Sequence, residues 1–205
     1  IRKIRIPVYW DLLEKEEGRY DFSDVDWQLQ EAQKRNAEII LVVGQKVPRW
    51  PECAIPEWAK NDDQKRKSSL MKEISTVIKR YKDGHPEIKY WQVENEPFLP
   101  FGICPPLDVD LLDSEIALVR ALDSTRPVIV TDSGELSLWI QAAKRADVFG
   151  TTMYRTIWKE GIGYFDYPIG PRCFRFKHWL IKTFDHQNNA IVVELQAEPW
   201  IAGWT

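Results

Sequence analysis

The sequence is poor in the residues that build metal sites and disulfide frameworks. It has three cysteines and three histidines among 205 residues, and no two cysteines form a C-x-x-C pair. Because Cys53, Cys104 and Cys173 are far apart and odd in number, we expect isolated thiols rather than disulfides or zinc ligands. His178 and His186 would lie about two helical turns apart, too far to share a metal ion. We therefore expect neither a metal nor another cofactor.

Long apolar runs and clusters of basic residues are also missing. No apolar run approaches the ~20 residues of a membrane span, so we expect no membrane-spanning helix. Lysine and arginine are not gathered among spaced aromatic residues, and the net charge is −3, so a nucleic-acid partner is not indicated. Hydrophobic residues make up 44% of the chain, which is enough for a full core. The composition leaves the oligomeric state open.

The chain opens on "IRKIRIPVYW", which already has the pattern of a strand. We expect that the natural N-terminus, with any targeting signal, precedes Ile1. The sequence therefore leaves the localisation open.

Short runs rich in isoleucine and valine alternate with helical patterns along the chain. Such runs are typical of strands covered on both faces. The expected strands are Ile4–Val8, Ile39–Val43, Ile88–Val93, Pro127–Thr131, Val148–Thr152 and Ile191–Val193. One expected helix begins near Ser23, and a second includes Leu70–Tyr81. Three further helices are expected at Asp108–Asp123, Leu136–Arg145 and Arg172–Phe184. This alternation predicts an α/β fold with a parallel sheet.

The connections between these elements are unequal. Links from helix to strand are short, for example "RNAE" and "DGHPE", whereas links from strand to helix are long, for example "ENEPFLPFGICPPLD". Long loops therefore gather at the C-terminal rim of the sheet, where (β/α) barrels carry their active sites. An open doubly wound sheet would also bind ligands there, but the glycine-rich first turn of a nucleotide site is missing.

Two carboxylates stand directly after apolar runs. Glu96 follows the third expected strand and Glu194 follows the last one, while Arg5 lies inside the first and Tyr154 follows the fifth. Two carboxyl groups that face each other across a cleft are the equipment of glycoside hydrolysis, in which one donates a proton and the other attacks. Proline after Glu96 ends the strand at the rim. Glu94 is expected to point to the same side as Glu96, as a supporting residue or a member of a buried ion pair.

The stretch "WQVENEPF" resembles the Asn-Glu-Pro signature of the clan A retaining glycoside hydrolases, which include the family 5 cellulases and mannanases and the family 42 β-galactosidases. The early segment "VYWDLLEKEEGRYDF" is also similar to that clan. The resemblance implies that Glu96 is the general acid/base and Glu194 the nucleophile. It further implies that Asn95 holds the sugar 2-hydroxyl, that Arg5 lies beside the nucleophile, and that Tyr154 hydrogen-bonds it.

The resemblance also implies an incomplete (β/α)8 TIM barrel. Counted from the signature, the visible strands are barrel strands two to seven, and strands one and eight are missing from this chain. We expect residues 1–205 to form a single, partial catalytic barrel domain. The family slightly favours a secreted or envelope-associated location.

Tryptophan is abundant, with ten residues. An indole ring stacks well on the apolar face of a sugar. Tryptophans expected on the elaborated rim are Trp10, Trp50, Trp158 and Trp200, and the first, second and last of these are predicted to bind substrate. Gln45 and the neighbouring Lys46 are further candidates for contacts with sugar hydroxyls.

The sequence thus predicts a retaining hydrolase of β-glycosidic bonds that acts on an oligo- or polysaccharide. Two alternatives stay open: a non-catalytic carbohydrate-binding barrel and a transglycosylase. The first has no need of both Glu96 and Glu194, whereas the second would use the same residues with a drier acceptor site.

Overall fold

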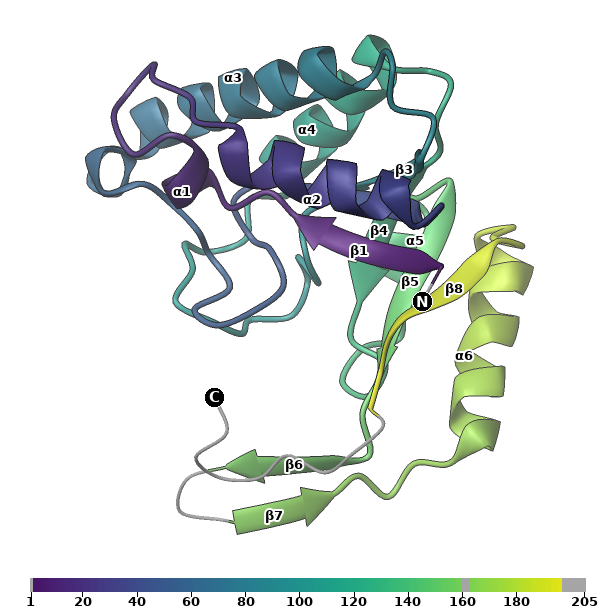
Figure 1. Cartoon of the computed structure of the whole chain (residues 1–205). Helices are drawn as coiled ribbons and strands as arrows, with labels where there is room; N and C mark the ends of the chain where they lie inside the picture. Colours follow the sequence, from purple (N-terminus) through teal and green to yellow (C-terminus); the bar gives the residue numbers. More distant parts are fainter. Residues whose placement is uncertain (1, 160–162, 197–205) are drawn as a thin grey trace.

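Six parallel strands form one curved sheet in this computed structural model, which describes residues 2–159 and 163–196 (Figure 1). The order across the sheet is β1-β2-β3-β4-β5-β8. The strands are β1 Lys3–Pro7, β2 Glu38–Val43, β3 Ile88–Val93, β4 Val128–Asp132, β5 Val148–Met153 and β8 Ala190–Leu195. This is the arrangement of an open part of a (β/α)8 barrel, as predicted, and each expected strand agrees with the structure to within two residues at either end.

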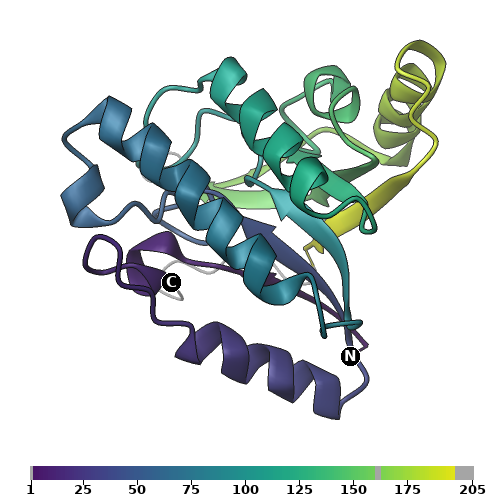
Figure 2. The same cartoon turned by 90° about the horizontal axis from the view of Figure 1, so that it is seen from above.

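The helices lie on the outer side of the curved sheet, as Figure 2 shows from above. They are α1 Trp10–Leu13, α2 Ser23–Lys34, η1 Glu57–Ala59, α3 Asp63–Tyr81, α4 Val109–Leu122, α5 Ile140–Ala143 and α6 Pro171–Phe184. Asp62 caps α3 and Asp108 caps α4, because each side chain accepts a hydrogen bond from a free backbone N–H of the first turn. No helix among the described residues is long and apolar enough to cross a membrane.

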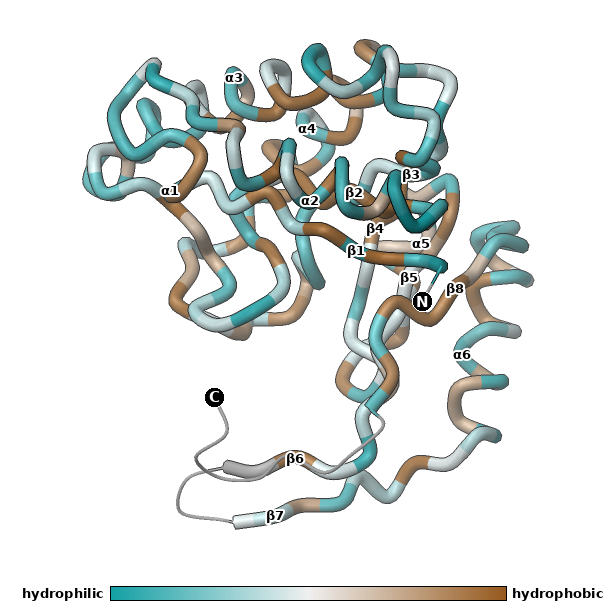
Figure 3. Tube along the Cα trace, viewed as in Figure 1, coloured by the Kyte–Doolittle hydropathy of each residue, from teal (hydrophilic) through white to brown (hydrophobic). Residues whose placement is uncertain are grey.

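The main core lies between the strands and the helices that cover them. Strand residues such as Leu41, Val43 and Trp91 pack against Ile74 and Val77 on the inner face of α3, and all five are completely buried. Figure 3 shows hydrophobic stretches along the strands, whereas hydrophilic and hydrophobic residues alternate along the helices α2 and α3. This packing fixes the positions of the strand ends, which carry the candidate site.

The segment between β5 and α6 contains a hairpin that the sequence did not predict. Strands β6 Thr156–Lys159 and β7 Gly163–Asp166 pair antiparallel with each other and form a separate two-stranded sheet. Their β-branched and aromatic residues are typical of strands. The two strands are short and lie within a long connection, so the sequence did not distinguish them from a loop. Helix α5 is shorter than predicted, because the Ser137 hydroxyl binds the backbone N–H of Trp139, which has a φ of +73° that a helix does not allow.

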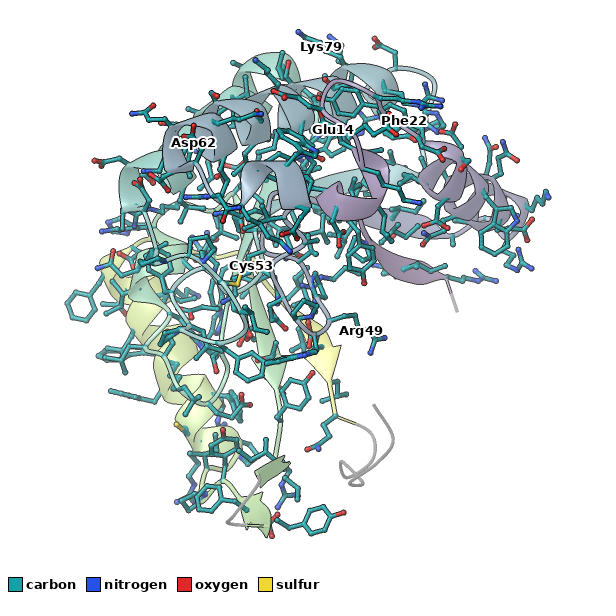
Figure 4. All side chains as sticks on the ribbon, turned by 90° about the vertical axis from the view of Figure 1, so that its left-hand side faces the viewer. Glu14, Phe22, Arg49, Cys53, Asp62 and Lys79 are labelled. Atoms are coloured by element: carbon teal, nitrogen blue, oxygen red, sulfur yellow. A yellow bond between two sulfur atoms is a disulfide. The ribbon has the colours of Figure 1, made fainter. Side chains whose placement is uncertain are left out.

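The cysteines correct a prediction. Cys53 and Cys104 form a disulfide, and only Cys173 is a free thiol (Figure 4). The two partners are 51 residues apart, which made a pairing look improbable. They follow β2 and β3, however, and these neighbouring parallel strands bring their loops together at the same rim.

Reducing the Cys53–Cys104 disulfide is expected to lower the free energy of unfolding by about 4 kcal/mol, because the reduced chain gains the freedom of a loop of about 50 residues. Urea unfolding with and without dithiothreitol measures the change. The variant Cys173→Ser is the control and should leave the midpoint in place. An unchanged midpoint after complete reduction would contradict the expectation.

Candidate active site

Four of the predicted residues meet at the C-terminal edge of the sheet. Arg5 of β1 donates hydrogen bonds to Oε1 of Glu194 and to Oδ1 of Asn95. The hydroxyl of Tyr154 donates to Oε2 of Glu194 at 2.6 Å. Strands β1 and β8 are the outermost strands of the sheet, so its curvature must bring them face to face for this contact to form (Figure 1).

Glu96 lies beside this group and is anchored through two threonines. Its backbone N–H donates to Oγ1 of Thr131 at 2.8 Å, and its Oε1 accepts from Oγ1 of Thr152 at 3.0 Å. Thr152 of β5 is the register partner of Glu194 on β8. The two predicted carboxyl groups therefore project from the same interior side of the curved sheet.

The electrostatics differ between the two carboxyl groups. Burial, and after it the negative charge of Glu194, raise the pKa of Glu96 to about 7. Glu194 accepts two hydrogen bonds, one from the guanidinium of Arg5 and one from the phenol of Tyr154. Burial and Glu194 raise the pKa of Tyr154, so this phenol stays a donor. The site thus pairs a buried carboxyl group of raised pKa with a carboxyl group held by two hydrogen-bond donors, and glycoside hydrolysis uses two carboxyl groups in such different surroundings.

A third carboxyl group in the site was missed. Oε2 of Glu52 accepts a hydrogen bond from Nδ2 of Asn95 at 3.0 Å, and only 9% of Glu52 is exposed. Burial raises the pKa of Glu52, while the bond to Asn95 and the charge of Lys46 lower it. Glu52 belongs to the long loop after β2, and its position directly before Cys53 carried no catalytic motif.

Glu94 does not point to the same side as Glu96. Strand β3 ends at Val93, and both glutamates have positive φ angles, 56° and 43°, so the alternation of a strand does not continue to them. The Glu94 carboxylate accepts the backbone N–H groups of Gln45 and Lys46 at 2.8 and 2.7 Å. Glu94 thus connects the end of β3 to the loop after β2. This contact is compatible with the expected supporting role, although the Glu94 carboxylate lies on the helix side of the sheet and not on the side of Glu96.

Glu94 is one of several carboxyl groups buried between the sheet and the helices. Burial raises the pKa of Glu94 to about 7, and burial together with the charge of Glu94 raises the pKa of the neighbouring Glu115 of α4 well above its usual range. Burial also raises the pKa of Glu73 of α3 well above its usual range. In the described part of the chain, no three histidine, cysteine, aspartate or glutamate side chains form a group that could hold a metal ion.

Among the described residues, the side chains of Gln45 and Lys46 form no hydrogen bond with the predicted catalytic carboxyl groups of Glu96 and Glu194. Both line a cavity of about 380 Å³ next to the Cys53–Cys104 disulfide, and neither Glu96 nor Glu194 contributes to its wall. The amide oxygen of Gln45 accepts from Arg66, so the predicted contact of Gln45 with sugar hydroxyls has no support. The ammonium of Lys46 donates to the carbonyl oxygens of Glu96 and Leu99 at 2.9 and 2.6 Å and fixes the loop after β3.

The tryptophans divide. Trp10 is completely buried and donates to Glu14 at 2.7 Å, so its assignment to substrate binding is wrong. Its place in a rim loop suggested exposure, but the short helix α1 turns it into the core. Trp50 is 67% exposed and packs edge-on against Phe101 at the rim, where its contact with sugar stays a prediction. Trp200 and the side chain of Trp158 lie outside the described residues.

Residues 7–104 match the family model of glycosyl hydrolase family 10. The matched segment covers just under half of the chain. It includes Asn95 and Glu96 and ends before the strand that carries Glu194. No curated protein shows significant sequence similarity to the chain.

Several solved glycoside hydrolases share this fold. Xylanase 10B from Thermotoga petrophila RKU-1 superimposes with a TM-score of 0.61 at 14% identity over 87% of this chain and 57% of its own. An exo-β-1,4-mannosidase from Opitutaceae bacterium strain TAV5 has a TM-score of 0.61 at 14% identity and 75% and 32% coverage. A β-galactosidase from Halorubrum lacusprofundi has a TM-score of 0.54 at 15% identity and 85% and 39% coverage.

These comparisons support the fold and the class that the sequence predicted. The fold is that of an incomplete (β/α)8 barrel, and the chain spans between about a third and about three-fifths of these structures. The partial match to glycosyl hydrolase family 10 supports the predicted class of glycoside hydrolase, which is taken up as a proposal below. The finer resemblance to families 5 and 42 is not specifically supported, because the matching family model is that of family 10.

Proposed function

We propose that the protein hydrolyses β-glycosidic bonds with retention of configuration, with Glu194 as nucleophile and Glu96 as general acid/base. The observation that carries this proposal is the contrast between the two carboxyl groups. Glu194 is bound by Arg5 and Tyr154, whereas Glu96 is buried with a pKa near 7. Retaining glycosidases require this pairing of an ionised nucleophile with a protonated acid.

In the first step, Oε of Glu194 attacks the anomeric carbon while Glu96 gives its proton to the departing glycosidic oxygen. Arg5 and Tyr154 hold the attacking carboxylate in one orientation. Once Glu194 is esterified, its charge is gone, and the pKa of Glu96 falls because the neighbouring negative charge that raised it is removed. Glu96 then acts as a base and takes a proton from a water molecule, whose oxygen attacks the anomeric carbon. The bond to Glu194 breaks, and the sugar leaves with its original configuration.

The substrate class is a β-linked oligo- or polysaccharide. The structurally similar proteins include a xylanase, a β-galactosidase and an exo-β-1,4-mannosidase, so β-xylosides, β-galactosides and β-mannosides are the first candidates. The Cys53–Cys104 disulfide favours an oxidising compartment, where polysaccharides are encountered.

The stereochemistry of the product tests this proposal. Aryl β-xyloside, β-galactoside and β-mannoside are each mixed with the full chain, and proton NMR follows the first sugar released. We expect the β-anomer to form first and the α-anomer to appear later by mutarotation. Initial release of the α-anomer, or no hydrolysis of any β-glycoside, would contradict the proposal.

A further inference from the structure

Glu52 adopts a backbone conformation that is energetically unfavourable for a residue with a side chain. Its φ is +74°, in the left-handed region that side chains with a Cβ rarely enter and that glycine enters freely. Its carboxyl group is also buried, which costs free energy unless the group is hydrogen-bonded. A glycine at this position would avoid both costs. Backbone strain of this kind persists mainly where the surroundings enforce it and function uses it.

The surroundings of Glu52 do enforce it. Its own N–H donates to the carbonyl of Arg49 at 2.6 Å, and its carbonyl accepts from Val47 at 2.7 Å. The loop after β3 closes over it: Gly102 lies so near that a Cβ there would stand 2.5 Å from the Glu52 Cβ. The next residue, Cys53, is fastened to that loop by its disulfide.

These contacts hold the Glu52 carboxylate in hydrogen-bonding position to Asn95. The amide N of Asn95 donates to Glu52, and the amide oxygen accepts from Arg5 on the opposite side. A carboxylate can only accept and a guanidinium can only donate, so the two ends of the amide are assigned without ambiguity. Asn95 is 3% exposed, and within residues 2–159 and 163–196 the hydrogen bond to Glu52 is the one that its amide nitrogen donates. That bond uses one of the two N–H groups of the amide.

We propose that Glu52 is a positioning residue that fixes the amide of Asn95 so that its second N–H meets the 2-hydroxyl of the bound sugar. This inference rests on the proposed function, because it assumes a sugar between Glu96 and Glu194. A continuous chain then runs from Glu52 through Asn95 and Arg5 to the carboxylate of Glu194. Hydrogen bonds to the 2-hydroxyl strengthen in the transition state of glycoside hydrolysis, so losing this alignment lowers the rate.

The test compares substrates with and without the 2-hydroxyl. Glu52→Gly removes the side chain and suits the positive φ, and Glu52→Gln keeps the shape but removes the charge. Each is assayed in the full chain on an aryl β-glycoside and on its 2-deoxy analogue. Glu57→Gln is the matched control, because Glu57 follows in the same connection and its side chain is 83% exposed. The thermal unfolding transition of every variant is measured as a check that each protein is folded.

With the 2-hydroxy substrate, we expect kcat/KM to fall about 10- to 100-fold in Glu52→Gly, the range of a lost hydrogen bond to a charged group, and less in Glu52→Gln. With the 2-deoxy substrate, both variants should match the wild type, and Glu57→Gln should match it on both. An equal loss on both substrates would make Glu52 merely structural and overturn the inference, as would no loss. Failure of the wild type to hydrolyse either substrate would instead refute the proposed function on which the inference rests.

Discussion

Replacing Glu194 with glutamine is expected to lower kcat by at least about 10⁴-fold on every β-glycoside, as removal of a catalytic nucleophile does in other enzymes. The amide has no negative charge with which to attack the anomeric carbon. It keeps the size of the side chain and can still accept from Arg5 or Tyr154, so the fold should be retained. Steady-state hydrolysis of an activated aryl glycoside measures the loss.

The control for this substitution is Glu38→Gln, at the exposed start of β2, where the carboxylate pairs only with Lys3. That variant should keep full activity. If Glu194→Gln retained more than about a hundredth of the wild-type kcat in a folded protein, Glu194 would not be the nucleophile.

Replacing Glu96 with alanine is expected to lower kcat/KM about 10²- to 10⁴-fold on substrates with poor leaving groups, because proton donation is lost. Substrates with good leaving groups need no such proton, so they should still form the glycosyl-enzyme. Added azide should then restore turnover with retention of configuration, since it attacks the intermediate without a base. If azide rescued Glu194→Ala with retained configuration instead, the two roles would be reversed.

The same residue governs the pH dependence. Glu96 must be protonated in the free enzyme, and its pKa is raised to about 7, so kcat/KM of the wild type should fall as the pH rises above about 7. In Glu96→Ala this alkaline limb should vanish. A limb that persists unchanged in the variant would assign the titration to another group.

The strands could be predicted because each is a local pattern. Ile39–Val43 and Ile88–Val93 are apolar, β-branched runs bounded by turn residues, and burial on both faces leaves few other structures for them. Glu96 and Glu194 were found for a related reason: charge directly after such a run must lie at the rim of the sheet. Arg5 and Tyr154 came from the resemblance, and the structure brings both onto Glu194.

The features that sequence did not reveal depend on how loops meet in space. The Cys53–Cys104 bond and the contact of Glu52 with Asn95 both join the loop after β2 to the segment after β3. Trp10 was misplaced because a short helix, rather than an open loop, follows β1. The direction of Glu94 was misjudged because its positive φ breaks the alternation, and a single sequence does not display backbone angles.

The central claim, that Glu194 forms a covalent glycosyl-enzyme, is tested most directly by trapping that intermediate. The full chain is incubated with 2,4-dinitrophenyl 2-deoxy-2-fluoro-β-glycosides of xylose, galactose and mannose, digested, and mapped by peptide mass spectrometry. We expect one of these sugars to inactivate the protein and to be esterified to Glu194. A label on Glu96 or Glu52, with Glu194 unmodified, would contradict the account.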